Sequence, residues 1–219
     1  MMKNNFLLSF LLLVIVSTYA QEDNSSKNKS YFGVRAGVNF LKGSNYDNHS
    51  SDLGVGFQVG GLVNLPLGKS NFSFQPEVLY MKVNGSETDV NLVYSNGKLT
   101  ELNEYSSNIF LVPLNFRYLI NNKIGIELGP SLGYRFSGNR NETNTFYEYA
   151  TGESNVSKFK SKSDGTKFSA LINLGVDYSI TNKINLGFKY YFSPAGFENS
   201  DKIMENSVFS FNLGYNFIK

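Results

Sequence analysis

The chain has 219 residues, of which 15% are aromatic and 20 are Gly, and it contains no Cys and no Trp. The absence of Cys excludes a disulfide scaffold, thiol catalysis and a Cys-ligated zinc site, and a formal net charge of +2 gives no basic footprint for nucleic acid. This mixture of Phe, Tyr and Gly favours strands over helices, and no apolar run reaches the roughly 20 residues that a membrane-spanning helix needs.

The N-terminal segment has the pattern of a secretory signal. Lys3 precedes an apolar run at residues 6–16, and small residues follow at a cleavage point. The run has the length of a signal peptide and is too short for a stable membrane anchor. We therefore expect residues 1–20 to be a signal peptide, 21–30 a polar periplasmic linker, and 31–219 the exported domain.

After the linker, eight segments place apolar residues at every second position, which is the period of a β-strand. The segments are residues 32–40, 53–65, 72–80, 110–120, 124–136, 168–180, 184–192 and 209–217. No position on these apolar faces is charged or carries an amide. The opposite faces carry glycines, amides and charged residues, so the two sides of each segment face different environments.

The volume of these side chains decides which face is outside. An eight-stranded barrel has an interior just wide enough for side chains to fill it, and so many large apolar groups cannot fit there. The apolar face must point outward, and a surface this apolar would not stay monomeric in water. The sequence thus predicts an all-β fold, an eight-stranded antiparallel up-and-down transmembrane β-barrel in the bacterial outer membrane.

The connections between the segments alternate in length. Three are short (66–71, 121–123 and 181–183), and four are long and polar (41–52, 81–108, 137–167 and 193–208). Short periplasmic turns and long external loops are typical of outer-membrane barrels. An even number of strands places both termini on one side, which we expect to be the periplasm.

Aromatic residues lie near both ends of the apolar face, as expected for interfacial girdles. The loop end holds Phe40, Tyr80, Phe110, Tyr134, Phe136, Phe168, Tyr190, Phe192 and Phe209, and the turn end holds Phe32, Phe72, Phe116, Tyr118, Tyr178, Tyr215 and Phe217. Pro76, Pro113 and Pro130 each delete a ladder donor inside a segment, and we expect local bulges at these positions.

The charged residues of the inward face nearly cancel. They are Arg35, Glu77, Arg117, Glu127, Arg135, Asp177 and Lys189. In a cramped interior such groups must pair or be hydrated. We expect a salt-bridge and hydrogen-bond network that plugs the barrel, and a narrow ion path lined by the same groups is the alternative.

Several motifs resemble strands of PorT-like outer-membrane barrel proteins of Bacteroidetes, which form an OmpA/OmpX-like eight-stranded barrel. They are FQPEVLY (74–80), LVPLNFRY (111–118), ELGP (127–130), GVDY (175–178) and FKYY (188–191). The resemblance spans residues 31–219 and implies the outer membrane and the barrel fold, not an activity. One member is linked to protein secretion across the outer membrane, so an accessory role in secretion is an alternative function.

The C-terminal residues 212–219 resemble the signal that the barrel-assembly machinery reads. They place polar, glycine and aromatic residues in the expected order, but Lys219 stands where an aromatic residue is expected. The resemblance makes the assembly machinery an expected partner during biogenesis, together with outer-membrane lipid.

Candidate chemistry outside the barrel is sparse. His49 is the single histidine and is followed by serines. A lipid A-modifying barrel enzyme would use such a pair, but general-base catalysis needs a fixed geometry that a loop does not supply. Asp47 and Asp52 do not have the spacing of a known calcium loop. We expect no catalytic residue, cofactor or metal site, and a lipid A-modifying enzyme is the remaining alternative.

Two of the long connections carry candidate binding surfaces. Lys158, Lys160, Lys162 and Lys167 form either a solvated loop face or a contact to lipopolysaccharide phosphates. Glu87, Asp89, Glu101 and Glu104 flank weakly alternating residues, so the third and fourth segments are predicted to project beyond the membrane as a hairpin.

An exposed hairpin edge would suit strand addition to a protein partner. The sequence as a whole therefore predicts a non-enzymatic outer-membrane barrel with a plugged polar interior and long surface loops, in a structural or binding and adhesion role.

Overall fold

The computed structural model describes residues 29–42, 49–120, 123–162, 168–193 and 207–218. The predicted signal peptide and most of the predicted linker lie outside the described residues. The described part contains no helix that is long and apolar enough to cross a membrane.

Ten antiparallel strands make up the part of the chain that the structure describes. They are β1 (Tyr31–Lys42), β2 (His49–Asp52), β3 (Gly54–Pro66), β4 (Phe72–Val93), β5 (Gly97–Ile120), β6 (Ile124–Glu148), β7 (Ser154–Lys162), β8 (Phe168–Ser179), β9 (Ile184–Phe192) and β10 (Ser207–Ile218). Eight of them form a ring in the order β1-β3-β4-β5-β6-β8-β9-β10, which β10 closes by pairing with β1. The predicted eight-stranded antiparallel barrel is confirmed, and β2 and β7 are additional.

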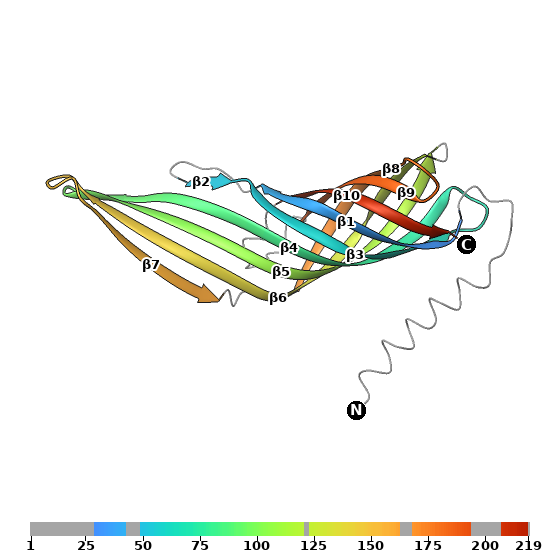
Figure 1. Ribbon diagram of the computed structural model, residues 1–219, viewed down its shortest axis with the longest axis horizontal. Coiled ribbons are helices and arrows are strands. Elements are labelled where there is room, and N and C mark those ends of the chain that lie inside the picture. The colour runs from blue at the N-terminus through green and yellow to red at the C-terminus, as the bar shows by residue number, and fades with distance from the viewer. Residues whose placement is uncertain (1–28, 43–48, 121–122, 163–167, 194–206, 219) are drawn as a thin grey trace, which may run out of the picture.

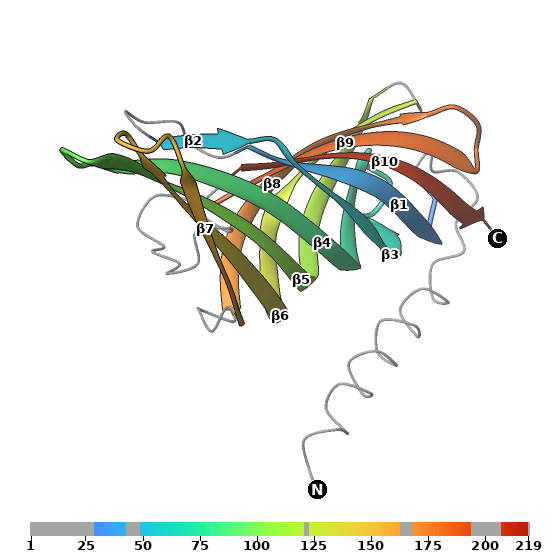
Figure 2. The same ribbon diagram turned by 60° about the vertical axis from the view of Figure 1, so that its left-hand side comes forward.

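The ring is continued on one side by a protruding sheet, which we call the extension. Strand β1 has 12 residues, whereas β4, β5 and β6 have 22, 24 and 25. A tilted transmembrane strand needs only about 9–11 residues, so roughly half of β4, β5 and β6 lies beyond the ring. Figure 1 shows these strands reaching to the left, with β7 beside β6 and β2 beside β4. Figure 2 shows the curvature of the same strands from another side.

The extension both confirms and corrects the sequence-based expectations. The predicted projecting hairpin is confirmed, since β4 and β5 pair from Phe72 with Tyr118 to Val93 with Lys98. The long polar connections predicted over residues 81–108 and 137–167 are mostly strands in the part of the chain that the structure describes, and the pairing of β6 with β7 is the part that the sequence does not predict. Beyond Met81 and Val83 most of their side chains are polar, so the regular apolar period stops while the backbone ladder continues.

The apolar faces of the ring strands point outward, as predicted. Phe32, Leu128 and Leu132 are 55%, 54% and 57% exposed, although they belong to strands that are paired on both edges. Aromatic side chains pack in rows at both rims. Ring centroids lie 4.8–4.9 Å apart in Phe32–Phe217, Phe72–Tyr118, Phe110–Phe136, Tyr190–Phe209 and Tyr134–Phe168. The two predicted girdles are present.

The interior has two layers, of which the sequence predicted one. Polar and charged side chains fill the half near the short turns. At the level of the loop-end girdle a buried apolar cluster fills the lumen, formed by Leu41, Leu79, Met81, Val83, Ile109, Leu111, Leu171, Tyr191 and Val208. We call it the apolar layer. An interior that is polar throughout was therefore a wrong expectation, because several strands are apolar on both faces at this height.

The prolines do not insert bulges. Pro76 pairs with Leu114, Pro113 with Ser131 and Pro130 with Ile172 without a change of register on either side. The predicted bulges are wrong at these positions, and a register shift lies instead next to Asn108, where β6 gains an extra residue. A proline thus removes a ladder bond without moving the faces of the strand.

Close approach between strands requires a glycine at position 129. A Cβ on Gly129 would collide with the backbone carbonyl of Leu114 on β5, whereas a Cβ on Gly187 meets nothing closer than 3.8 Å. We expect Gly129→Ala to destabilise the barrel by about 1–3 kcal/mol, since the backbone must shift. Gly187→Ala is the matched control and should be neutral or slightly stabilising. Urea unfolding of the two variants in lipid vesicles measures both, and equal stabilities would contradict the close approach.

Candidate functional site

Two buried carboxylates and two buried cations meet inside the ring, each on a different strand. Glu77 on β4 lies 3.1 Å from Arg35 and 2.5 Å from Lys189. Glu127 on β6 lies 3.5 Å from Arg35 and 2.7 Å from Lys189. All four side chains are at most 4% exposed. The four charges sum to zero, which lets them remain ionised away from water.

Two amides complete this cluster. The Gln75 side chain donates to Glu127 over 2.8 Å and to Glu77 over 3.2 Å. The Asn115 side chain donates to Glu77 over 2.9 Å and to Glu127 over 3.3 Å. Charge-assisted hydrogen bonds of this kind fix the orientation of both carboxylates. We call these six residues the interior network.

A second ion pair lies nearer the turn end of the barrel. Arg117 donates to Asp177 through Nε over 3.0 Å and through Nη2 over 2.9 Å, a bidentate arrangement. A side chain on Gly125 would collide with both partners, so the glycine makes room for the pair. Arg135 is also buried, but it lies opposite Ile109 at the height of the apolar layer. Six of the seven predicted interior charges therefore come together in two clusters, and Arg135 lies at another height of the barrel.

The apolar layer closes the lumen above the interior network. Leu79, Ile109 and Leu111 are completely buried in it. An ion that crossed the barrel would have to displace these groups and then separate the ion pairs below them. Among the described residues there is no group of three side chains that could hold a metal ion. The arrangement fills the interior and holds its strands together.

The inner face of the extension carries its own polar contacts. The Tyr105 hydroxyl donates to Glu87 over 3.1 Å, and the Arg140 guanidinium donates to Asn103 over 2.9 Å. Burial, and then the neighbouring Glu87 charge, raises the pKa of Tyr105 well above its usual range. The hydroxyl therefore keeps its proton and remains a donor, which ties β5 to β4 outside the ring.

The predicted lysine cluster lies on β7 rather than in a loop. Lys158, Lys160 and Lys162 are exposed and alternate with residues of the opposite face. They pair with Thr143, Asn141 and Asn139 of β6. The fourth member of the predicted cluster, Lys167, lies outside the described residues.

Two of the candidate catalytic and calcium-binding residues, His49 and Asp52, belong to β2. The backbone of His49 pairs with Asp89 on β4, and its side chain is outside the described part, as is all of Asp47. Asp52 accepts a hydrogen bond from the Ser86 hydroxyl over 3.3 Å. These contacts attach β2 to the extension.

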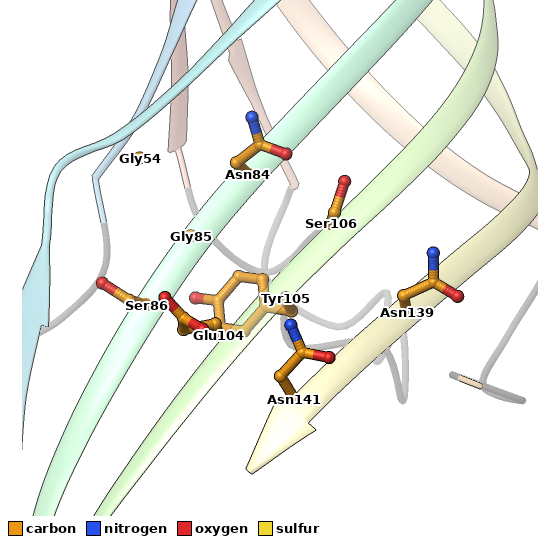
Figure 3. Close-up of a pocket in the computed structure, with 9 residues that line it drawn as sticks. All are labelled: Gly54, Asn84, Gly85, Ser86, Glu104, Tyr105, Ser106, Asn139 and Asn141. Atoms are coloured by element: carbon orange, nitrogen blue, oxygen red, sulfur yellow. The ribbon is translucent and has the colours of Figure 1, made fainter. Parts of the chain in front are cut away.

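A polar hollow of about 340 Å³ lies on the extension, and the sequence alone does not predict it. Its side chains come from β4, β5 and β6, and Figure 3 shows them together. The sequence signal was the repeat of small polar residues at every second position, as in Asn84 with Ser86 and Asn139 with Asn141. Because the repeat lacks apolar residues, it does not distinguish a strand from a polar loop.

Comparison with known proteins gives a family and distant structural similarities. The model of the family described as "Outer membrane protein beta-barrel domain" matches residues 19–202. No curated protein matches the chain.

Three solved structures illustrate the similarities. Ail, the attachment invasion locus protein of Yersinia pestis, solved with the heparin analogue sucrose octasulfate, is 14% identical with a TM-score of 0.37, over 86% of this chain and 97% of that chain. Neisserial surface protein A is 15% identical with a TM-score of 0.32, over 86% and 97%. An outer membrane channel of Pseudomonas putida F1 is 10% identical with a TM-score of 0.29, over 91% and 100%. With such low scores, nothing that these proteins bind is carried over to this chain.

Removing one charge from the interior network should lower the free energy of unfolding of the barrel. Lys189→Met leaves Glu77 and Glu127 with one cation between them, and breaking a buried ion pair in this way costs about 3–5 kcal/mol. Lys183→Met, in the exposed turn before β9, is the matched control and should change stability by less than about 0.5 kcal/mol. The free energy of unfolding in urea measures both.

A double variant separates charge balance from packing. Lys189→Met combined with Glu77→Gln leaves Arg35 facing Glu127 alone, so the remaining charges cancel again. We expect the double variant to be more stable than the sum of the two single effects predicts, because neighbouring sites are coupled. Strictly additive losses would show that the four groups do not act as one network.

Proposed function

The chain belongs to the outer membrane protein beta-barrel domain family, and on this premise we propose that it is a non-enzymatic, closed barrel whose extension is a binding surface outside the membrane. The observation that carries the proposal is the division of the molecule. The ring is filled by the interior network and the apolar layer, whereas the extension continues beyond it. The filled ring anchors the protein in the membrane, and the sheet of the extension provides a surface for binding.

The orientation in the membrane follows from the short turns. The Leu119 amide donates to Asn71, the Ser179 amide to Lys123 and the Asn216 amide to Lys183. These bonds join the turns to neighbouring strand ends at one rim, where β1 begins and β10 ends. Short turns in outer-membrane barrels face the periplasm, so we place both termini there and the extension on the cell surface.

The extension offers two kinds of contact. Lys158, Lys160 and Lys162 on β7 are placed to meet phosphate groups of lipopolysaccharide, which supports contact with the outer leaflet. The second edge of β7, which pairs with no described strand, is a surface for a protein partner, as in adhesion, although lysines on an edge strand disfavour pairing with further strands. We therefore propose lipid contact first and protein contact second.

The narrower alternatives are tested by other measurements. An accessory role in secretion, suggested by the PorT-like motifs, should appear as loss of secreted proteins in a deletion strain. A lipid A-modifying activity should appear as a change in the lipid A mass spectrum of the same strain. We expect neither change, because the proposal assigns the protein no chemical step.

Planar-bilayer recordings test the closed interior. We expect the purified barrel to give no large stable conductance, since both the apolar layer and the interior network block the lumen. A porin recorded in the same bilayers shows that the assay detects pores, and the heat-modifiable band of folded protein shows that the barrel is intact. A stable open channel would overturn the closed barrel.

A further inference from the structure

Hydroxyl, amide and ammonium groups form cross-strand rows on the outer face of the extension, the face that continues from the loop-end girdle. The pairing of β4, β5, β6 and β7 gives the rows Asn84–Ser106–Asn139–Lys162, Ser86–Glu104–Asn141–Lys160 and Thr88–Leu102–Thr143–Lys158. Directly opposed residues have Cβ atoms about 4.5–5.5 Å apart. Adjoining groups in one row can therefore contact the same ligand.

The polar hollow lies within the first two rows. Its outer-face side chains are Asn84, Ser86, Glu104, Ser106, Asn139 and Asn141, and Figure 3 shows them along three neighbouring strands. Asn and Ser both donate and accept hydrogen bonds, and a carboxylate accepts them. With one charge among six polar groups, the hollow suits a ligand that is rich in hydroxyl groups.

The lysines of β7 form a column at the side of the hollow. Successive members are two residues apart, which is about 6.7 Å along a strand. No ion pair between described residues includes Lys158, Lys160 or Lys162. Glu104 is two strands away from Lys160, about 10 Å at the usual strand spacing. The ammonium groups are therefore available to an anion.

The position of the hollow relative to the membrane narrows the choice of ligand. The Tyr80 hydroxyl of the girdle donates to Asn108 over 2.6 Å, and the Asn108 amide donates to Ser137 over 2.7 Å. Ser106 is four residues beyond Phe110 of the girdle, about 13 Å along the strand, and less along the membrane normal because the strands tilt. The hollow thus faces the headgroup layer directly outside the hydrocarbon.

We propose that the hollow and the lysine column together bind the phosphorylated saccharide headgroup of an outer-leaflet lipid, namely lipopolysaccharide. The hollow takes sugar hydroxyls, and Lys160 and Lys162 take phosphates beside them. Lysine binds phosphate as a point charge, and basic residues near an anionic lipid surface add to the affinity. The inference rests on the proposed function, because it needs the extension to lie on the cell surface.

An acidic protein segment added to the edge of β7 is the competing occupant. It would pair with the β7 backbone and leave the hollow unused. The lysines that would attract it also make β7 a poor template for a further strand. The hollow lies directly beside the lysines, and only the lipid headgroup would use both. This arrangement therefore favours the lipid headgroup over the protein segment.

Binding measurements on the full barrel in detergent test the proposal. The probes are intact lipopolysaccharide, chemically dephosphorylated lipopolysaccharide and inorganic phosphate. We expect the double change Lys160→Gln and Lys162→Gln to weaken binding of intact lipopolysaccharide by about 25-fold, roughly fivefold for each lysine. Asn141→Leu, which fills the hollow, should weaken binding about tenfold and should also weaken the residual binding of the dephosphorylated probe.

Two matched variants serve as controls. Lys183→Gln removes a lysine at the opposite rim, and Ser154→Val changes an exposed β7 residue that does not line the hollow. Both should bind like the unchanged protein, and the heat-modifiable band confirms that every variant is folded.

Three results would overturn the inference. If only the lysine changes weaken binding, the contact is electrostatic and the hollow binds no sugar. If inorganic phosphate displaces lipopolysaccharide at equal concentration, the site binds free phosphate. If lipopolysaccharide does not bind while an acidic peptide does, β7 is a protein edge. None of these binding results bears on whether the barrel conducts ions. The proposal of a closed barrel is tested separately by the bilayer recordings.

Discussion

Hydrocarbon offers no hydrogen-bond partner to a peptide group, and the architecture of this protein follows from that constraint. Inside the membrane every strand must be paired on both edges, so β10 returns to β1 and the sheet closes. The hydrocarbon of the bilayer also inverts the side-chain distribution of a water-soluble protein, so that apolar side chains lie outside and polar ones inside. Phe32, Leu128 and Leu132 are exposed on the outside, while aromatic rings gather at the two levels where lipid meets water.

Closure in turn limits what the interior can contain. With eight strands the lumen has room for side chains but not for a water column, so charges that enter it must neutralise one another. Glu77 and Glu127 meet this condition with Arg35 and Lys189, and Asp177 meets it with Arg117. The apolar layer fills the rest of the lumen at the loop end. The ring is therefore a filled support whose stability depends on a few buried charges.

Beyond the girdle water satisfies unpaired peptide groups, and the constraint no longer applies. There β4, β5 and β6 continue as an open sheet, β7 contributes a free edge, and β2 adds four residues to β4. Most side chains on both faces become polar, and contacts such as Tyr105 with Glu87 join the strands on the inner side. Function then depends on which polar groups the register places side by side on the outer face, and there lysines adjoin a hollow lined by amides and hydroxyls.

The sequence by itself determined the eight ring strands, the outward direction of their apolar faces, the girdles and the inward position of the charged residues. All of these follow from the two-residue period, which is a local property of each strand. Only the tertiary structure decided that Glu77 meets Lys189, that Leu79 and Ile109 close the lumen, and that Lys160 lies opposite Asn141. These contacts depend on strand register and ring closure between distant segments, which a local period does not encode.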